Sequence, residues 1–356
     1  MPFVHRPVAS GGMETEPKQI RYARQTVLRE IGEAGQSAVA SATAVVVGLG
    51  ALGSNSANLL ARAGVGTLRL ADRDFVDWTN LQRQCLFEED DAAQSLPKSE
   101  AATRHLRRIN SSIRYEPMTD DINPGNVERI VAGATVVVDG LDNFYTRALV
   151  NQACVKHGIP WIYGACLGTY GNAATIIPGI SACLNCFLPD VAEATTPPLS
   201  CETVGVLGPV ASLIAAWQSA EALKILAGKQ DAVSPHLVHV GLWDNDFSAL
   251  PVTRDSACAV CGQHKFELLE HGSRLATASL CGRDAVQIVP PPSFHMDFEL
   301  LRETLSRIVT LSENPFLIKF RVDGHDVVVF HDGRAMVFGT SDPRVALSLY
   351  GKYIGG

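Results

Sequence analysis

The sequence AVVVGLGALG, residues 44–53, decides the fold class of this chain. Its first four residues are a short β-branched run, typical of a strand buried on both faces of a parallel sheet. Gly48, Gly50 and Gly53 then form a G-x-G-x-x-G motif that opens a helical stretch ending near Ala63. Glycines let backbone amides approach phosphates, and a helix N-terminus favours negative charge. The motif therefore predicts a nucleotide-binding turn. The alternative is the same turn in a fold that binds no nucleotide.

The segments that follow extend this pattern into a sheet. A second predicted strand, 67–71, ends at Asp72, roughly 20 residues after the last glycine, where a carboxylate can bind ribose hydroxyls. Further buried strands are predicted at 135–138 and 161–163, with helical segments between them. Strands that alternate with helices indicate an α/β fold with a Rossmann-like, doubly wound, mostly parallel sheet.

Composition excludes several classes of protein. With 46% apolar and 19% charged residues, a chain of 356 residues can bury a large core, so global disorder is excluded. The 30 Lys and Arg against 37 Asp and Glu give a net charge of −7. A basic surface for nucleic acid is therefore not expected. No segment reaches the roughly 18 apolar residues of a membrane helix, and no secretory signal is evident. We expect a soluble, cytoplasmic protein.

The length predicts more than one domain. We expect a loose leader at 1–18, a main α/β part at 19–272 that starts with a helix from Arg21 to about Ala40, and a small α+β appendage at 273–356. Turn sequences and short apolar runs support the appendage. Its predicted strands are 316–320, 327–330 and 335–338, followed by a helix at 347–353.

The segment DRDFV…NLQRQ, residues 72–84, distinguishes ATP from NAD as the nucleotide. The segment contains Asn80 and Arg83, and Lys98 follows shortly after it. All three residues are expected near the predicted phosphate site. A hydride-transfer site has no need for two cations there. A site that cleaves a phosphoanhydride needs them, because negative charge grows on the leaving pyrophosphate.

Several segments follow one another in a characteristic order: RYARQ at 21–25, the glycine loop, residues 72–84, Lys98, the D-x-x-D at 139–142 and two cysteine pairs. Together they resemble the ThiF/MoeB/HesA family of ubiquitin-activating-like adenylyltransferases, over about residues 20–265. The resemblance implies that the C-terminal carboxylate of a small ubiquitin-like carrier protein ending in Gly-Gly attacks the α-phosphate of ATP, forming an acyl-adenylate and releasing pyrophosphate. A protein that donates sulfur is a further implied partner.

The resemblance also implies roles for individual residues. Asp142 would bind Mg²⁺, a cation that prefers carboxylate and phosphate oxygens. Arg24 matches an arginine that crosses into the partner subunit's active site, which implies a homodimer. The residues implied for binding ATP are Gly48, Gly50, Gly53, Asp72, Asp74, Asn80, Arg83, Gln84 and Lys98.

Four of the nine cysteines form two C-x-x-C pairs, Cys183 with Cys186 and Cys258 with Cys261. Four thiolates are the ligand set of a closed tetrahedral structural zinc site. The family has such a site at this position, and it would staple two distant loops. The alternative, a pair of redox motifs, lacks the helix start expected after the first cysteine.

Cys201 lies in a proline-rich polar loop before a helix predicted at 209–226. Its position matches the family cysteine that forms a thioester or an acyl-disulfide with the activated carrier. A thiolate is the nucleophile such a step needs. The alternative is a bystander, since some family members adenylate without this cysteine. The cysteines expected to be buried or incidental are Cys85, Cys154, Cys166 and Cys281.

The role of the appendage stays open. Nothing in it resembles a rhodanese active loop, because Cys281 lies at the wrong end of the segment. The chain ends in Gly355-Gly356, which is either a frayed helix end or a tail that is itself adenylated. Two other functions compete with adenylation: a catalytically silent zinc-stapled scaffold that binds a carrier, and an NAD-dependent oxidoreductase. The sequence names neither the carrier nor the pathway.

Overall fold

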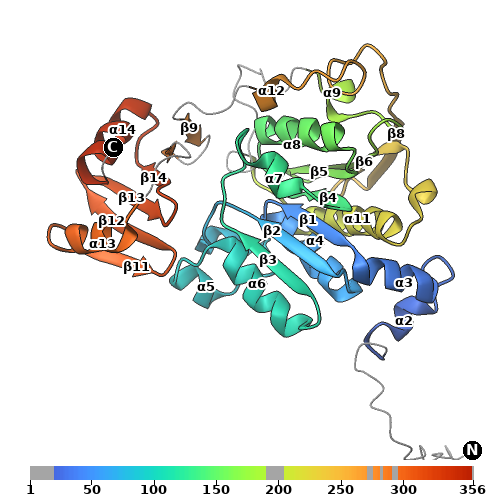
Figure 1. Ribbon diagram of the computed structural model, residues 1–356, viewed down its shortest axis with the longest axis horizontal. Helices are drawn as coiled ribbons and strands as arrows, with labels where there is room; N and C mark the ends of the chain where they lie inside the picture. The colour runs from blue at the N-terminus through green and yellow to red at the C-terminus, as the bar shows by residue number, and fades with distance from the viewer. Residues whose placement is uncertain (1–19, 190–203, 271–275, 281–283, 291–295, 355–356) are drawn as a thin grey trace, which may run out of the picture.

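The larger sheet has eight strands in the order β3-β2-β1-β4-β5-β6-β7-β8. The computed structural model describes residues 20–189, 204–270, 276–280, 284–290 and 296–354 (Figure 1). The first five strands in this order pair in parallel and the last three pair antiparallel, which confirms the predicted mostly parallel sheet. The strands are β1 (Thr43–Val47), β2 (Thr67–Ala71), β3 (Arg114–Met118), β4 (Val136–Asp139), β5 (Trp161–Leu167), β6 (Tyr170–Ile176), β7 (His236–Gly241) and β8 (Asp246–Pro251).

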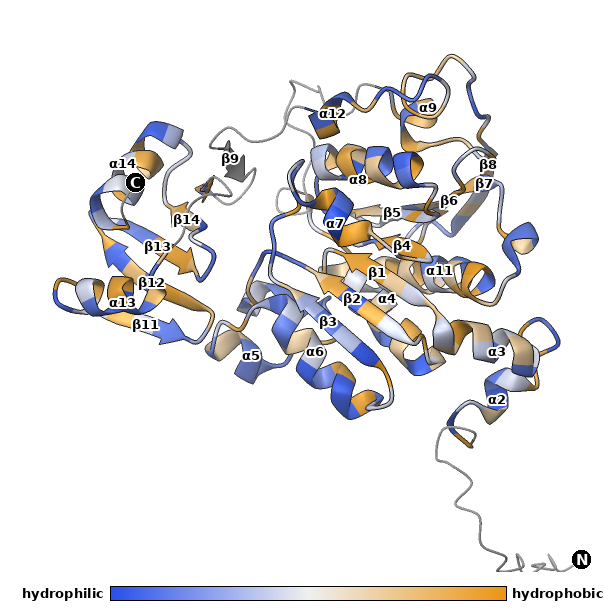
Figure 2. Cartoon of the chain, viewed as in Figure 1, coloured by the Kyte–Doolittle hydropathy of each residue, from blue (hydrophilic) through white to orange (hydrophobic). Residues whose placement is uncertain are grey.

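Helices cover both faces of this sheet, which explains why the central strands β1 and β4 are apolar over most of their length (Figure 2). Val46 points into the core on one face, and Val45 and Val47 point into the core on the other. Helices α3 (Gly32–Ser41), α4 (Ala51–Ala63), α6 (Lys98–Ile109) and α11 (Gly208–Leu226) contribute to the first core. Helices α7 (Val127–Val131) and α8 (Phe144–His157) contribute to the second.

The predicted helix from Arg21 to Ala40 is wrong in one respect, because the structure divides it in two. A short helix, α2 (Ala23–Thr26), is separated from α3 by a turn. Gly32, the first residue of α3, has a φ of +63°, a left-handed conformation that interrupts a right-handed helix. The side chain of Gln25 donates a hydrogen bond to the carbonyl of Ala63 at the end of α4. Helix α2 therefore lies at the C-terminal end of α4, whereas the glycine loop lies at its N-terminal end.

A second, six-stranded sheet has the order β11-β12-β13-β14-β10-β9 and is antiparallel. Asp323 and Gly324 both have positive φ at the turn between β12 and β13, the geometry of a tight hairpin. The elements are β9 (Ala276–Leu280), β10 (Ala285–Val289), α13 (Phe298–Ser306), β11 (Leu311–Asn314), β12 (Leu317–Val322), β13 (His325–Phe330), β14 (Ala335–Phe338) and α14 (Pro343–Tyr353). The α+β character and the three strands expected from sequence are thus present.

The two faces of the second sheet have different neighbours. Helices α13 and α14 pack on one face. On the other face Phe75, from the larger part of the chain, packs against a small apolar cluster of Leu317, Val328, Phe330 and Met336. Figure 1 shows this sheet beside α5 (Glu89–Ala93) and β3. The remaining short elements are η1 (Trp78–Asn80), α9 (Leu184–Phe187), η2 (Gln230–Ala232) and α12 (Glu267–Glu270). None of the helices in the described part of the chain is long and apolar enough to span a bilayer.

Candidate functional site

The glycine loop lies where the strand order reverses. Strand β1 has β2 on one side and β4 on the other, and the chain leaves β1 through Gly48. The Gly48 amide donates to the Ala71 carbonyl at 2.7 Å, and the Gly140 amide donates to the Val47 carbonyl at 2.7 Å. In open α/β sheets, ligands bind outside the carboxyl ends of the strands at such a switch point.

The three glycines of the motif serve different purposes. Gly48 has a φ of +83°, which favours glycine. A Cβ at Gly53 would lie 1.8 Å from the carbonyl oxygen of Gly48, so only glycine fits at this point of contact between helix and strand. A Cβ at Gly50 would have no neighbour closer than 3.7 Å. Gly50 therefore leaves open space beside the loop, whereas Gly53 is required by packing.

Asp72 joins the glycine loop to the end of β2. One carboxylate oxygen accepts the Leu49 amide at 2.5 Å, and the other accepts the Asp74 amide at 2.7 Å. Burial raises the pKa of Asp72, and the positive charge of Lys98 opposes that rise. Each carboxylate oxygen has a second lone pair, so the side chain can still accept hydrogen bonds from a ribose.

Lys98 is the first residue of α6, and its exposed fraction is only 3%. Its Nζ lies 3.2 Å from an oxygen of Asp74, and its backbone amide donates to the Asp74 carbonyl at 2.9 Å. The structure thus brings together two residues that the sequence separates widely. Asp74 orients the ammonium group beside the glycine-loop edge of the sheet.

The NLQRQ segment folds as the short helix η1 and the turn after it. Asn80 is buried, and its side-chain oxygen accepts the Asp77 amide at 3.1 Å. The guanidinium of Arg83 donates to the Thr79 carbonyl at 2.7 Å and is partly exposed. Gln84 is buried, and its Nε2 lies 3.9 Å from a Cβ built on Gly50. Asn80 therefore stabilises the turn, whereas the side chain of Arg83 is partly accessible to solvent.

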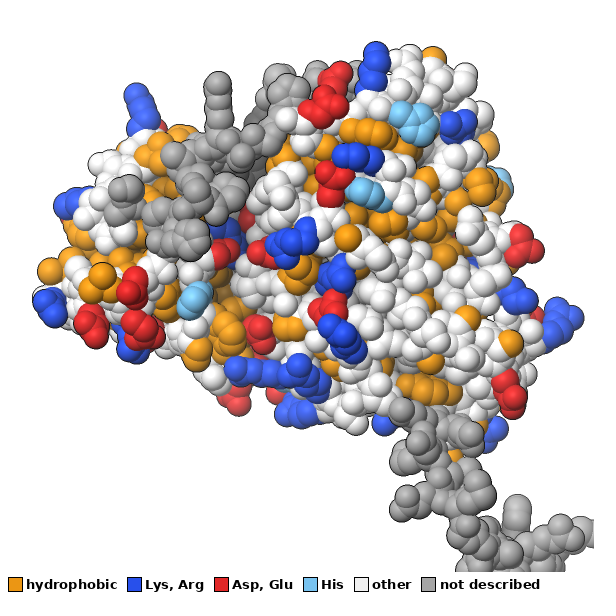
Figure 3. All heavy atoms as spheres, viewed as in Figure 1, with side chains coloured by type: hydrophobic (Ala, Val, Ile, Leu, Met, Phe, Trp, Pro, Cys, Tyr) orange, Lys and Arg blue, Asp and Glu red, His pale blue; other side chains and the backbone are white. Residues whose placement is uncertain are grey.

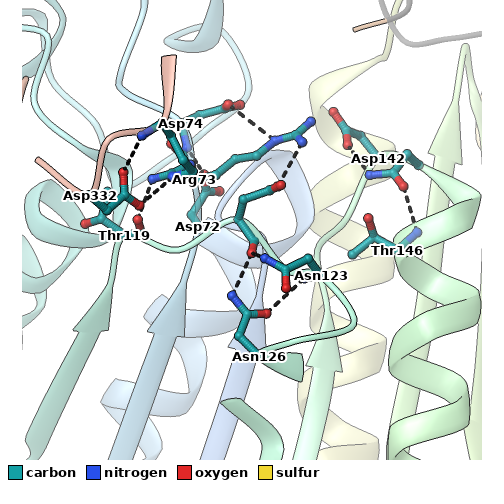
Figure 4. Close-up of polar contacts among 12 residues, drawn as sticks. Asp72, Arg73, Asp74, Thr119, Asn123, Asn126, Asp142, Thr146 and Asp332 are labelled. Atoms are coloured by element: carbon teal, nitrogen blue, oxygen red, sulfur yellow. Dashed lines mark hydrogen bonds and ion pairs between the residues drawn. The ribbon is translucent and has the colours of Figure 1, made fainter. Parts of the chain in front are cut away.

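Arg73 is a residue of the site that the sequence analysis did not single out. Its Nη1 lies 2.9 Å from an oxygen of Asp121, and its Nε lies 3.8 Å from Asp74. Burial would lower the pKa of Arg73, but Asp121, Asp74 and Asp142 raise it above its usual value. Figure 4 shows Arg73 extending toward Asp142. The arginine between Asp72 and Asp74 was a visible signal in the sequence, but nothing there connected it with Asp121.

The two aspartates of the D-x-x-D motif have opposite environments. Asp139 is fully buried and accepts a hydrogen bond from Arg147 Nε at 2.9 Å. Burial raises the pKa of Asp139, and Arg147 opposes that rise. Arg147 also donates to the carbonyls of Leu141 and Gly164. Asp142 is exposed on the turn before α8. Asp139 therefore anchors the turn, and Asp142 is presented to solvent.

Arg24 does not reach this site within one chain. It is exposed on α2, and α2 lies at the opposite edge of the sheet, as Gln25 shows by its contact with Ala63.

The two cysteine pairs converge, although about 70 residues separate them. All four Sγ atoms lie within 4.8 Å of one another. The Cys183 and Cys258 sulfurs are 3.7 Å apart, and the Cys186 and Cys261 sulfurs are 3.4 Å apart. These distances exceed the roughly 2.05 Å of a disulfide. They are close to the roughly 3.8 Å between ligands of a tetrahedral zinc–thiolate centre.

The surroundings of this cluster also fit a structural metal. Cys183, Cys258 and Cys261 are buried in the core that contains α8. Burial raises the pKa of Cys183, and burial raises that of Cys261 to about 11. Four buried sulfurs this close together can be thiolates only when a cation is bound, because their negative charges repel. The closed set of four sulfurs suits zinc and leaves no position for a substrate.

The remaining cysteines divide by environment. Cys154 is fully buried, Cys166 is partly buried and Cys85 is exposed. Cys201 and Cys281, like Gly355-Gly356 and the predicted leader, lie outside the described residues. The segment just after Cys201 is described: Gly168 exchanges backbone hydrogen bonds of 2.8 Å with Gly205 and Leu207. A Cβ built on Gly208 would lie 3.3 Å from the Gln82 carbonyl and 3.7 Å from Arg83 Cβ. Gly208 therefore lies next to Arg83.

Known proteins match this chain in sequence and in fold. Residues 22–260 match the ThiF family. The sulfur carrier protein ThiS adenylyltransferase of Bacillus subtilis (strain 168) is 41% identical over 340 residues, covering 94% of this chain and 99% of that protein. The SAMP-activating enzyme E1 of Haloferax volcanii is 37% identical, covering 70% of this chain and 91% of that protein.

Among solved structures, E. coli MccB with ATP superimposes with a TM-score of 0.58 at 25% identity, covering 68% of this chain and 74% of that one. Together with the sequence matches and the glycine loop at the switch point, this likeness confirms the resemblance seen in the sequence: the chain belongs to the ThiF family.

Proposed function

We propose that this protein uses ATP to adenylate the C-terminal Gly-Gly carboxylate of a small ubiquitin-like sulfur-carrier protein. The observation that carries the proposal is the convergence of Asp72, Asp74 and Lys98 at the open end of the glycine loop. The names of the relatives point to the same activity, since one is a ThiS adenylyltransferase and another an E1. We assign residues 19–272 to adenylation and regard 273–356 as a small C-terminal α+β module.

The chemistry follows from charge and position. A carboxylate oxygen of the carrier attacks the α-phosphorus of ATP, the bond from that phosphorus to the bridging oxygen breaks, and pyrophosphate leaves with the electron pair. Asp72 binds the ribose, and the amides of the glycine loop face the phosphates. Lys98 and Arg83 compensate the charge that develops on pyrophosphate. Asp74 holds Lys98 in place, while Asn80 and Gln84 shape the floor of the site.

Mg²⁺ is the proposed metal cofactor of this step. The exposed carboxylate of Asp142 can coordinate it together with phosphate oxygens. Mg²⁺ supplies Lewis-acid stabilisation of the phosphates when bound. The buried ion pair between Asp139 and Arg147 keeps the turn that carries Asp142 in one position.

A homodimer is the proposed assembly. Arg24 is exposed far from the site of its own chain, so it can act only in the site of a partner. Large apolar side chains are exposed near α2 and along α11, and a partner would cover them. These are Ile20, Val27, Leu28, Leu213 and Trp217. Nucleic acid is not a proposed partner: on the face in Figure 3, Lys and Arg lie among Asp and Glu. A cytoplasmic location fits four cysteines that form a metal-ligand set and no disulfide.

Cys201 is the proposed nucleophile of the following step. Its thiolate attacks the acyl carbon of the adenylate, AMP leaves and a thioester forms. Where a sulfur-donor protein has first left a persulfide on Cys201, the same attack gives an acyl-disulfide. The position of Gly208 supports this role, because it follows Cys201 closely in the chain and lies beside Arg83.

Replacing Cys201 by serine is expected to leave ATP–pyrophosphate exchange unchanged within about twofold and to reduce sulfur transfer to the carrier by more than about 100-fold, since a serine hydroxyl is a poor nucleophile here. Mass spectrometry of the carrier C-terminus measures thiocarboxylate formation. Cys85→Ser removes an exposed thiol and serves as the matched control. Undiminished thiocarboxylate in Cys201→Ser would make Cys201 a bystander.

ATP–pyrophosphate exchange tests the proposed function itself. The purified protein is assayed alone and with a panel of Gly-Gly-ended small β-grasp proteins. Exchange that requires one carrier supports adenylation and identifies the partner. Exchange without a carrier points to the chain's own Gly355-Gly356. Absence of exchange throughout, in protein that contains zinc and binds ATP, favours a scaffold over an enzyme.

A further inference from the structure

We propose that the C-terminal module, residues 273–356, is part of the nucleotide site's framework, and that Arg334 is a positioning residue for ATP binding. The inference rests on the proposed location of the ATP site. Arg334 lies just before β14, on the side of the second sheet that faces the larger part of the chain. Its guanidinium spans the boundary between the two parts and holds two loops of the ATP site by their backbone.

The contacts of Arg334 are specific. Its exposed fraction is 3%. Nη2 donates to the carbonyl of Thr119 at 2.5 Å, and Nη1 lies 3.4 Å from the carbonyl of Arg73. Nε pairs with Asp332 at 2.6 Å, and the guanidinium carbon lies 4.5 Å from the centre of the Phe330 ring. A buried guanidinium needs such partners, because an unpaired buried charge is very costly. The side chain is therefore fixed rather than freely rotating.

The two carbonyls belong to loops that carry the site. Arg73 stands between Asp72, the proposed ribose ligand, and Asp74, the partner of Lys98. Thr119 follows β3, and its hydroxyl is 2.8 Å from that of Ser99, the residue after Lys98. Figure 4 shows Asp332 and Thr119 beside the Asp72–Asp74 segment. One guanidinium thus joins the loops that follow β2 and β3, and both contribute charged groups to the site.

A second set of contacts docks the module onto the stretch of chain between Asp74 and Lys98. Lys319 Nζ lies 3.9 Å from the centre of the Phe75 ring and donates to the Ser95 hydroxyl at 2.5 Å. Asn314 donates to the carbonyls of Gln94 and Ser95 at 2.9 and 3.0 Å. The module therefore holds both ends of the stretch between Asp74 and Lys98. Its position restricts how far the loop that carries Asp72 and Asp74 can move away from a bound nucleotide.

Steady-state exchange kinetics of the full-length protein test this inference. Arg334→Gln is expected to raise the KM for ATP about tenfold, since a charged hydrogen bond to each loop is lost. The KM for the carrier is expected to stay unchanged. Arg334→Lys keeps the charge but cannot reach both carbonyls, so an intermediate increase of about threefold is expected. Arg321→Gln replaces an exposed arginine of β12 that pairs with Asp326 and has no part in the contacts described above; as the matched control it should leave both KM values unchanged.

An unchanged KM for ATP in both Arg334 variants, with zinc content and thermal unfolding as in wild type, would overturn the inference. So would equal effects on ATP and carrier, because these indicate general destabilisation. If Arg334→Gln does not fold, Arg334→Lys decides. If the wild type shows no exchange, the proposed function fails instead. Calorimetric titration with ATP then tests the role of Arg334. Equal ATP affinity in the wild type and in Arg334→Gln would overturn that role.

Discussion

Replacing Lys98 by alanine is expected to lower ATP–pyrophosphate exchange by about 100- to 1,000-fold, the cost of removing one preorganised charge from a developing anion. Lys98 is suited to this task because its ammonium group is buried and held by Asp74 at 3.2 Å. A fixed charge in a poorly hydrated site acts more strongly than one in water. The loss should appear at saturating ATP and carrier, since it affects the transition state.

The matched control is Lys156→Ala on the outer surface of α8. Lys156 is exposed and pairs with Glu128 at 2.8 Å, an arrangement that contributes little to stability. Exchange should be unchanged in this variant. Exchange in Lys98→Ala within about threefold of wild type would contradict the role assigned to Lys98.

Lys98→Ala should also change how stability depends on pH. Burial already raises the pKa of Asp72 above its usual value of 3.8, and Lys98 opposes that rise. Without Lys98 the pKa rises further. A carboxyl whose folded-state pKa is raised contributes stability that is fully present below its unfolded pKa and is lost as pH rises through the folded value. The variant's deficit in free energy of unfolding should therefore be larger near pH 7 than near pH 4, as urea denaturation can measure. Equal deficits at both pH values would contradict the coupling.

Removing the metal is expected to have the largest effect on stability. Cys186→Ser leaves three sulfurs and should reduce zinc from about one ion per chain to a small fraction. The midpoint of thermal unfolding should fall by at least about 10 °C, because the metal joins two loops and its binding energy is folding energy. The cluster is part of the core around α8, where Leu184 donates its amide to Asn151 at 3.1 Å. Loosening it should therefore destabilise one whole face of the sheet.

Metal analysis and calorimetry of Cys186→Ser and Cys85→Ser provide this measurement. Cys85 is exposed and outside the cluster, so its replacement should retain both zinc and stability. A wild-type protein with far less than one metal ion per chain, together with an unchanged unfolding midpoint in Cys186→Ser, would rule out a structural zinc site.

Sequence patterns predicted most reliably those elements whose defining residues are neighbours in the chain. The strand, glycine turn and helix at 44–63 were predictable because a β-branched run, three glycines and a helical stretch are neighbours in sequence. The antiparallel strands β6 to β8 were not predicted. Strand β8 is largely exposed and carries no apolar run that a pattern could detect. The cysteine cluster was an exception: it was predictable across a long gap in the chain, because two C-x-x-C pairs together supply the four sulfur ligands of one structural zinc ion.

What the sequence determined by itself was the class of fold, the glycine loop and the family, because these depend on residue type and on short spacings. The tertiary structure alone decided which of two motif aspartates is buried: Asp139 pairs with Arg147, and Asp142 is exposed. It also decided that Arg334 touches Arg73, 261 residues earlier in the chain. Burial and ion-pair partners are set by long-range packing, and no local pattern encodes which distant side chain will remove a charge from water.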